Sequence, residues 1–192
     1  MTYRQIRDDE FIRGKVPMTK SEVRTLSVIK MQIVEKDVVW DIGAGTGSIS
    51  VEAGINYPSS KIYAIEKNSE GIDLINENIK KFNVNNIIPI KGAAPDVFQK
   101  LEPPNSVIIG GSGGNLEEIL EYLWSLDSLK NIVVNAVTIN TAFLGMKFFN
   151  KKNADFESIQ INISNIEMIK EYQMLKGQNP IFIISAKKQE EK

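Results

Sequence analysis

The chain has 192 residues, of which 42% are hydrophobic and 24% are charged, and its formal net charge is −1. It contains no cysteine and no histidine, which excludes disulfides, thiolate nucleophiles, imidazole bases and metal sites built from those ligands. A balanced charge does not favour nucleic-acid binding, and the apolar runs have the length of strands rather than of membrane spans. We therefore expect a protein that binds neither nucleic acid nor membrane. We expect it in the cytoplasm, and the absence of cysteine is also compatible with export.

The N-terminal part of the chain predicts a loop followed by one helix. Residues 19–22, Thr-Lys-Ser-Glu, have the form of a capping box and follow Pro17 and Met18. The loop just before this box is placed to lie over a ligand at the strand ends of an open α/β sheet. An apolar stripe at helical spacing indicates that the helix packs on the sheet. The stripe consists of Val23, Leu26, Ile29 and Ile33.

All four arginines of the chain lie within its first 24 residues. The planar guanidinium fork suits carboxylates in a way that the lysine ammonium does not match. This clustering predicts that some of the arginines bind an acidic ligand, and plain surface charge explains the same pattern equally well. The four are Arg4, Arg7, Arg13 and Arg24.

Strand-length apolar runs alternate with helical patterns through the middle of the chain. Five such repeats, with strands rich in isoleucine and valine, indicate a parallel sheet covered by helices. The tail has another rhythm, with alternating apolar and polar residues at 158–164 and an apolar run at 180–188. The apolar runs of the repeats cover residues 38–43, 61–67, 86–92, 106–111 and 131–137. The helical patterns cover residues 48–55, 70–82, 95–101, 116–126 and 141–152.

A glycine-rich turn follows the first apolar run. Residues 41–47 read Asp-Ile-Gly-Ala-Gly-Thr-Gly, and Glu66 closes the second run. Glycines let the backbone approach a ligand closely, and a carboxylate at that strand end can accept bonds from ribose hydroxyls. The third glycine comes one residue too early for a dinucleotide motif, and no lysine follows the loop as in a P-loop. Asp41 either orders the turn or receives the cationic end of S-adenosylmethionine, and the chain here resembles the class I methyltransferases that use this donor.

A second glycine cluster lies at the end of the fourth strand-length run. Residues 110–115 read Gly-Gly-Ser-Gly-Gly-Asn and open a helical pattern. Small residues leave room for a large flat methyl acceptor, and the helix start behind them offers free N–H groups to an anion. Residues 179–182, Asn-Pro-Ile-Phe, are similar to the tetrad of adenine methyltransferases, but they stand at the last strand and predict a turn.

The combined motifs select one family. With DDEFIR, VPMTKSEVR, VVWDIGAGTGSISVE, YAIEKN and GGSGGNLEEIL, the chain resembles the decarboxylating precorrin C-15 methyltransferases of the cobalamin pathway. The resemblance implies an α/β, Rossmann-like class I methyltransferase fold, with a mostly parallel seven-stranded sheet, helices on both faces and an antiparallel C-terminal strand pair. We expect one domain over 1–192, with an extended N-terminal segment and a helix at 1–36, a cofactor-binding core at 37–152 and C-terminal strands at 153–192. The family is typically homotetrameric, which implies contacts through residues 165–179 and the last strand pair.

The resemblance also implies roles for residues of the donor site. Thr19 would contact the cofactor, a role that competes with its place in the capping box. Glu66 would hold the ribose, and Ala94 would flank the adenine through its backbone. Ala93 stands where relatives often carry an acid that can accept from the adenine amino group. The alanine cannot make this side-chain contact, whereas a backbone contact to adenine is unaffected. The loop that would cradle the methionine end consists of Gly43, Ala44, Gly45, Thr46 and Gly47.

The family reaction methylates C-15 of a cobalt-containing tetrapyrrole and removes carbon dioxide from its C-12 acetate. S-adenosylmethionine donates the methyl group, no protein-bound metal is implied, and positioning can carry the chemistry, so we assign no catalytic side chain. The acetate and propionate groups of such a substrate need cationic partners. The expected substrate-side residues are Gly111, Ser112, Gly113, Arg13, Lys20 and Arg24.

Two other functions are compatible with the same donor motif. A class I methyltransferase that acts on RNA or on a protein side chain would share the donor site and differ at the acceptor edge. A nucleotide-sensing module without catalysis would also need the glycine-rich turn, and the chain offers no obvious catalytic side chain against it. Turnover of the donor with a tetrapyrrole, compared with tRNA, separates the three functions.

Overall fold

The structure is a computed structural model that describes residues 2–188. Its strands within this range are β1 (Val38–Ile42), β2 (Lys61–Glu66), β3 (Ile87–Lys91), β4 (Ser106–Ile109), β5 (Asn131–Ala136), β6 (Asp155–Ile161), β7 (Ser164–Ile169), β8 (Tyr172–Gly177) and β9 (Ile181–Lys187). Its helices are α1 (Ser21–Lys30), α2 (Ser48–Asn56), α3 (Ser69–Phe82), α4 (Leu116–Trp124) and α5 (Ile139–Lys151), with short 3-10 turns η1 (Asp8–Glu10) and η2 (Phe98–Lys100). None of the helices described is long and apolar enough to cross a membrane.

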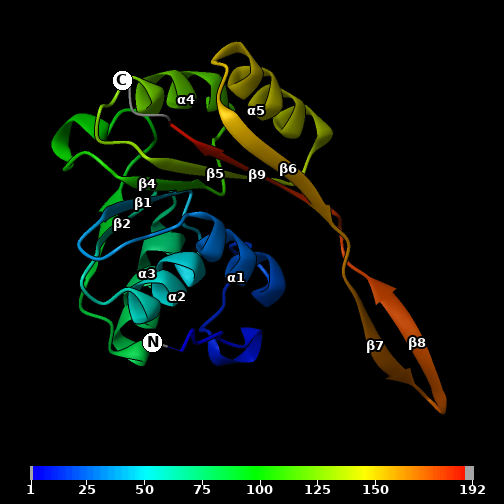
Figure 1. Cartoon of the computed structure of the whole chain (residues 1–192). Helices are drawn as coiled ribbons and strands as arrows, with labels where there is room; N and C mark the ends of the chain where they lie inside the picture. The colour runs from blue at the N-terminus through cyan, green and yellow to red at the C-terminus, as the bar shows by residue number, and fades with distance from the viewer. Residues whose placement is uncertain (1, 189–192) are drawn as a thin grey trace.

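Seven strands form one sheet in the order β3-β2-β1-β4-β5-β9-β6 (Figure 1). β1 to β5 run parallel, and β9 inserts between β5 and β6 in the opposite direction. The expected seven-stranded, mostly parallel sheet and its antiparallel C-terminal strand pair are therefore confirmed. Since all five residues of β1 are buried, this strand is the central, fully covered type that a Val/Ile-rich run indicates.

Helices cover both faces of the sheet, as expected. One face packs against α4 and α5 through a core that includes Trp40, Leu120 and Phe149. The other face packs against α1, α2 and α3 through a core that includes Val39 and Ile75. Because Val39 and Trp40 are neighbours on β1 and point to opposite faces, each strand serves both cores, as Figure 1 shows for the two helical layers.

Two helix predictions are wrong in detail. The pattern at 95–101 yields only the turn η2, in which buried Phe98 packs its ring 4.8 Å from that of Trp40. Helix α1 starts at Ser21, its N-cap is Lys20 without a side-chain capping bond, and the Ser21 hydroxyl donates to Glu22 instead. The expected capping box is therefore absent from this helix, which leaves the Thr19 side chain outside any cap.

The buried face of α1 also differs from the expected stripe. Ile29 is 50% exposed, and Ile33 lies beyond the end of the helix. The buried positions include Arg24 and Ser27, whose polar groups are paired with other side chains. Hydrophobic periodicity cannot identify a helix face that is built on paired polar residues.

Strands β7 and β8 form a separate two-stranded ribbon that projects from the body of the molecule, here called the arm (residues 164–177) (Figure 1). Every residue of both strands is exposed. The sequence pattern predicts no strand in this segment, because no core imposes a period on its side chains.

Candidate active site

The glycine-rich turn after β1 lies at the carboxyl end of the parallel strands. Gly43, Gly45 and Gly47 have φ values of +74°, +58° and +74°, in the left-handed region that favours glycine. A Cβ added at Gly43 would lie 2.5 Å from the carbonyl oxygen of Gly111 and 2.7 Å from its Cα. The two glycine clusters are therefore in backbone contact, which requires that Gly43 carries no side chain, whereas a Cβ at Gly111 would lie 3.8 Å from the Gly43 Cα, an ordinary contact.

Glu66, at the end of β2, organises this turn. Its Oε2 accepts a hydrogen bond from the backbone N–H of Gly45 at 2.9 Å, and its Oε1 accepts one from that of Asn68 at 2.8 Å. The residue is 8% exposed and lies on the wall of a cavity. An ionised carboxylate has about four acceptor positions, so two remain for hydroxyl groups of a ligand in the cavity.

Asp41 orders the start of α2. Its Oδ2 accepts hydrogen bonds from the Ser50 backbone N–H at 3.1 Å and from the Ser50 hydroxyl at 2.6 Å. The side chain is buried, and this burial raises the pKa of Asp41 from 3.8 to about 6. Since Asp41 is not among the residues that line the cavity, the structure supports the first of its two considered roles, ordering of the turn.

The second glycine cluster lies between β4 and α4. Gly113 has a φ of +61°, and a Cβ added there would lie 3.2 Å from Lys67 Nζ. The N-cap residue of α4, Asn115, forms no side-chain capping bond, so it does not occupy the amides of the first turn. A cationic group and a glycine loop thus meet at this edge of the cavity.

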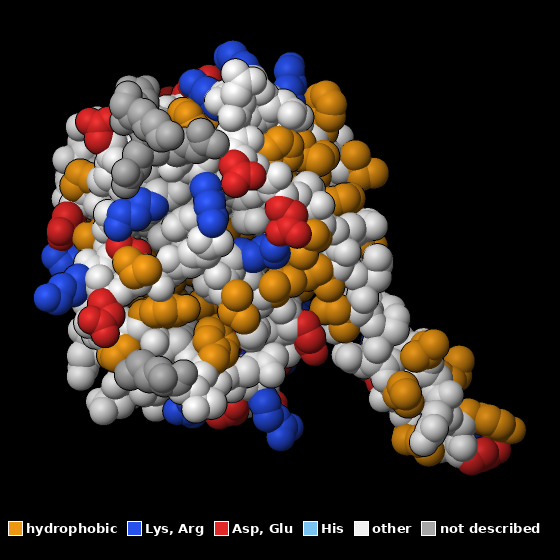
Figure 2. Space-filling view, in the orientation of Figure 1, with side chains coloured by type: hydrophobic (Ala, Val, Ile, Leu, Met, Phe, Trp, Pro, Cys, Tyr) orange, Lys and Arg blue, Asp and Glu red, His pale blue; other side chains and the backbone are white. Residues whose placement is uncertain are grey.

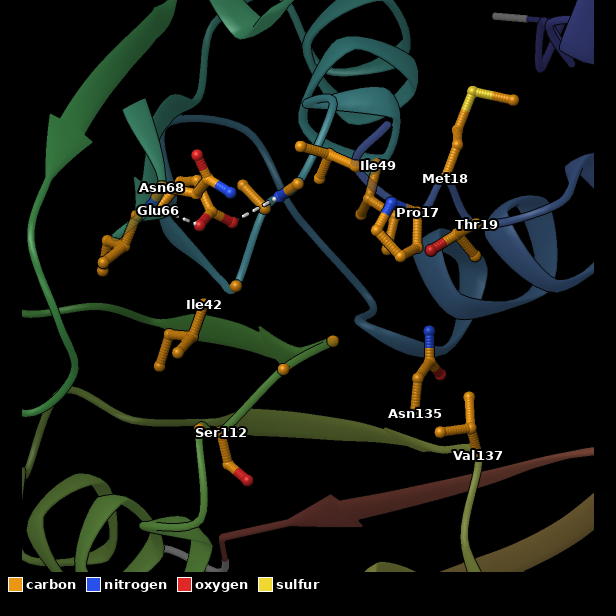
Figure 3. A pocket seen from close by; sticks show the side chains of 18 of the residues that line it. Pro17, Met18, Thr19, Ile42, Ile49, Glu66, Asn68, Ser112, Asn135 and Val137 are labelled. Atoms are coloured by element: carbon orange, nitrogen blue, oxygen red, sulfur yellow. Dashed lines mark hydrogen bonds between the residues drawn. The ribbon is translucent and has the colours of Figure 1, made fainter. Parts of the chain in front are cut away.

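One cavity of about 750 Å³ joins both glycine clusters. In Figure 3, Glu66 and Asn68 lie on one side of it, Pro17 and Thr19 lie across from them, and Ser112 lies beside the end of β4. The lining segments are residues 15–20, 42–45, 65–68, 92–94 and 110–113, with Val23, Ile49, Glu70, Asn115, Asn135, Val137, Ile163, Gln178, Asn179 and Ile181.

Most of the site residues expected from the sequence meet in this cavity: Thr19, Lys20, Gly43, Ala44, Gly45, Glu66, Ala94, Gly111, Ser112 and Gly113. Thr46 and Gly47 do not line it. The Thr46 side chain is buried, and a Cβ at Gly47 would lie 3.0 Å from Ile75 on α3. In the structure these two residues therefore lie behind the turn, away from the cavity wall, and their contact with the cofactor stays a prediction.

The structure also places two of the expected substrate-side arginines away from the cavity wall. Arg24 is fully buried; its Nε donates to Glu52 Oε2 at 2.7 Å, and its Nη1 donates to Asp8 Oδ1 at 3.1 Å. Arg13 is exposed and lies outside the cavity lining. Neither guanidinium is placed to pair with a substrate carboxylate in the cavity, because partner choice depends on folded geometry that arginine clustering does not encode.

The structure adds residues that sequence reasoning missed. Lys15 and Lys67 line the cavity, as do Asn135 at the end of β5 and the pair 178–179 at the base of the arm. Lys67 directly follows Glu66, so its place at a strand end was a usable signal. No sequence signal brings residues 178–179 to the cavity, because they arrive there only through the return of β8 toward β9.

The fold and the site together define a class I methyltransferase. A parallel sheet with one reversed strand carries a glycine-rich turn after β1 and a carboxylate at the end of β2, which suits an adenosyl ligand at the carboxyl edge. Among the described residues, no three histidine, cysteine, aspartate or glutamate side chains group as metal ligands do. The chain matches the precorrin methyltransferase domain family over residues 10–188, and it belongs to that family.

Relatives agree with this assignment. A protein of Sulfurisphaera tokodaii, named probable cobalt-precorrin-6B C(15)-methyltransferase (decarboxylating), is 36% identical over 95% of this chain and 97% of its own length. A protein of Methanocaldococcus jannaschii with the same name is 36% identical over 94% and 97%.

Solved structures extend the likeness. Precorrin-6y C5,15-methyltransferase from Geobacter metallireducens has a TM-score of 0.88, 37% identity and 96% coverage of both chains. Precorrin 8w decarboxylase from Methanobacterium thermoautotrophicum has a TM-score of 0.87 and 31% identity, and the match covers 94% of this chain and 98% of that one. A tRNA (m1A58) methyltransferase from Aquifex aeolicus, with 16% identity and a TM-score of 0.65, shares the fold alone.

Proposed function

We propose that this protein transfers a methyl group from S-adenosylmethionine to C-15 of a cobalt-precorrin and promotes loss of carbon dioxide from the C-12 acetate, in cobalamin biosynthesis. The observation that carries the proposal is the single cavity that both glycine clusters line. Gly43 and Gly111 are in backbone contact, so a donor bound at the first cluster and a bulky acceptor bound at the second can meet there. The names of the full-length relatives support the acceptor.

On the donor side, Glu66 accepts hydrogen bonds from the two ribose hydroxyls. It uses the acceptor positions of its carboxylate that the N–H groups of Gly45 and Asn68 do not occupy. Gly43, Ala44 and Gly45 take the methionine end. The backbone at Ala94, on the cavity wall after β3, flanks the adenine. Thr19, whose hydroxyl points into the cavity in Figure 3 and caps no helix, contacts the donor from the opposite side.

On the acceptor side, lysines take the role first expected of arginines. Lys15, Lys20 and Lys67 line the cavity and can pair with acetate and propionate groups of a tetrapyrrole. Gly111, Ser112 and Gly113 leave room for the plane of the macrocycle. Tight binding of the departing acetate would stabilise its ionised ground state and slow its loss, so the lysines serve the spectator carboxylates.

The chemistry needs positioning more than a catalytic side chain. The sulfonium of the donor supplies an activated methyl group, the electron-rich ring accepts it, and the same conjugated ring can take up the electron pair that is left when carbon dioxide departs. The chain contributes by holding donor and acceptor close and in line and by keeping water out of the cavity. This role is compatible with a chain that has no histidine and no cysteine.

The test is turnover with a defined acceptor. Purified protein is incubated with methyl-labelled S-adenosylmethionine and a cobalt-precorrin, and both label in the tetrapyrrole and released carbon dioxide are measured. We expect both products. Label in tRNA or in protein but not in tetrapyrrole supports the alternative of an RNA or protein methyltransferase, and binding of the donor without any transfer supports a sensing module.

We also propose that four copies assemble through the arm. The pairing of β7 with β8 places Ile166, Met168 and Leu175 on one face of the ribbon and Ile169, Tyr172 and Met174 on the other. These side chains are between 50% and 74% exposed, and Figure 2 shows hydrophobic groups along the projecting arm. A ribbon with apolar side chains on both faces can bury them only if other copies contact it from two sides.

Light scattering after size exclusion tests the assembly. We expect a mass of four chains for the unchanged protein and a lower mass for an Ile166→Lys, Leu175→Lys variant. A matched charge change outside the arm, Glu77→Lys on the exposed surface of α3, keeps the tetramer. A monomer for the unchanged protein would contradict the proposal. We further propose that the enzyme works in the cytoplasm without nucleic acid, which fractionation and a tRNA-binding assay check.

A further inference from the structure

A short irregular segment crosses the glycine-rich turn and forms one wall of the cavity. Residues 15–19, here called the strap, approach Gly45 so closely that a Cβ added there would lie 3.0 Å from the Pro17 carbonyl oxygen. Among the described residues, Val16, Pro17 and Met18 form no hydrogen bond with another group. The position of the strap therefore depends on its two ends and on packing.

The first end is held by Glu70, in the first turn of α3. Glu70 Oε1 accepts a hydrogen bond from the Lys15 backbone N–H at 2.7 Å. A Cβ added at Gly14 would lie 2.6 Å from the same oxygen, so the carboxylate fits against bare backbone. Because the Glu70 backbone N–H is itself capped by Asn68 Oδ1, the acceptor sits on a fixed helix start.

The second end is held by Arg24. Its Nη1 donates to the Thr19 carbonyl oxygen at 2.7 Å, while its Nε donates to Glu52 Oε2 at 2.7 Å. Both side chains of this ion pair are fully buried. Glu52 belongs to α2, which begins directly after the glycine-rich turn, so the ion pair ties the strap to the same helix that the turn leads into.

We propose that Glu70 and Arg24 are positioning residues that hold the strap against the glycine-rich turn and thereby set the affinity for the methyl donor. Each acts through a backbone group of the strap. When the hydrogen bond at one end of the strap is lost, the strap samples more conformations. The donor must then order the strap on binding, which weakens the affinity for the donor and speeds its release. The affinity part of this inference rests on the proposed donor site.

The first experiment needs no ligand. Trypsin can cleave after Arg13 and Lys15, at the start of the strap. Limited digestion of the ligand-free protein compares the unchanged chain with Glu70→Ala and with the matched control Glu77→Ala, an exposed carboxylate on the same helix. We expect faster cleavage after residues 13 and 15 in Glu70→Ala alone, with the thermal unfolding temperature unchanged in both variants.

The second experiment measures binding of S-adenosylhomocysteine by calorimetry and its release by stopped flow. Glu70→Ala should weaken binding by about tenfold, the equivalent of one hydrogen bond, mainly through faster release. Glu70→Gln keeps an oxygen that can accept from Lys15 and should restore both tryptic resistance and affinity. Arg24→Lys keeps a positive charge beside Glu52 but loses the bonds to the Thr19 carbonyl, to Asp8 and to the Ile6 carbonyl, so its losses of tryptic resistance and of affinity should be at least as large as those of Glu70→Ala.

The outcomes separate the two proposals. If the unchanged protein does not bind S-adenosylhomocysteine, the proposed function fails, while the digestion still reports on the strap. If Glu70→Ala resists trypsin as the unchanged protein does, the strap is held by packing and the inference is wrong. Faster cleavage with unaltered affinity would also overturn it, because the strap would then move freely without any effect on the donor.

Discussion

The replacement Glu66→Gln tests the donor site with the smallest change of shape. In the unchanged protein the backbone N–H groups of Gly45 and Asn68 donate to the two Glu66 oxygens at 2.9 and 2.8 Å. In the variant one of these oxygens becomes an NH₂ group, which faces one of the two N–H groups and cannot accept from it. At least one of these bonds is lost, and an amide left without a partner lowers the free energy of unfolding by about 1–3 kcal/mol. The ribose also loses a charged acceptor, worth about 1.5–3 kcal/mol, or roughly 10- to 150-fold in affinity.

Calorimetry with S-adenosylhomocysteine and urea unfolding measure the two effects on the same protein. The matched control is Glu77→Gln on the exposed surface of α3, which should leave both quantities unchanged. If Glu66→Gln bound the ligand within twofold of the unchanged protein, Glu66 would not hold the ribose. A lost affinity with unaltered stability would instead show that the two loop bonds matter little to the fold.

Three further changes probe the rest of the site. Gly43→Ala should lower the free energy of unfolding, measured with urea, by about 2 kcal/mol or more, because its Cβ would lie 2.5 Å from the Gly111 carbonyl oxygen at a φ of +74°. Gly110→Ala is the control in the same experiment, because its Cβ would lie 3.5 Å from the Gly43 carbonyl oxygen. Gly113→Phe should abolish methylation of the tetrapyrrole while calorimetry finds the affinity for S-adenosylhomocysteine within twofold, and retained turnover would move the acceptor site elsewhere. Asp41 has a folded-state pKa raised from 3.8 to about 6, so its ionisation costs the folded state up to about 3 kcal/mol as the pH rises through this interval. Asp41→Asn removes that cost, so its stability relative to the unchanged protein, from urea unfolding, should rise between pH 4 and pH 7, and a constant difference would contradict the raised pKa.

Local pattern was enough to predict the sheet and the donor turn. The Val38–Ile42 run, the glycines after it and Glu66 at the next strand end are close together in the sequence, and each follows from backbone rules that hold in any open α/β sheet. The same is true of the helical pattern at 70–82, which corresponds to α3 (Ser69–Phe82) and buries Ile75.

Pairing across long sequence distances could not be predicted in this way. Arg24 has the composition of a ligand-binding residue, but its partner Glu52 lies 28 positions later, and only the folded chain brings them together. Thr19 has the pattern of a helix cap, but α1 starts two residues further on and leaves its hydroxyl to the cavity. The apolar side chains of the arm follow no core period, since nothing in one copy of the chain covers them.

The arm should make part of the thermal unfolding of the protein depend on protein concentration. A two-stranded ribbon has no interior and is at best marginally ordered in water, whereas the seven-stranded sheet keeps two cores within one chain. In the proposed tetramer, mass action therefore divides unfolding into a step that releases the arms and a step that melts the cores. Raising the protein concentration should shift the first step to higher temperature and leave the second where it is.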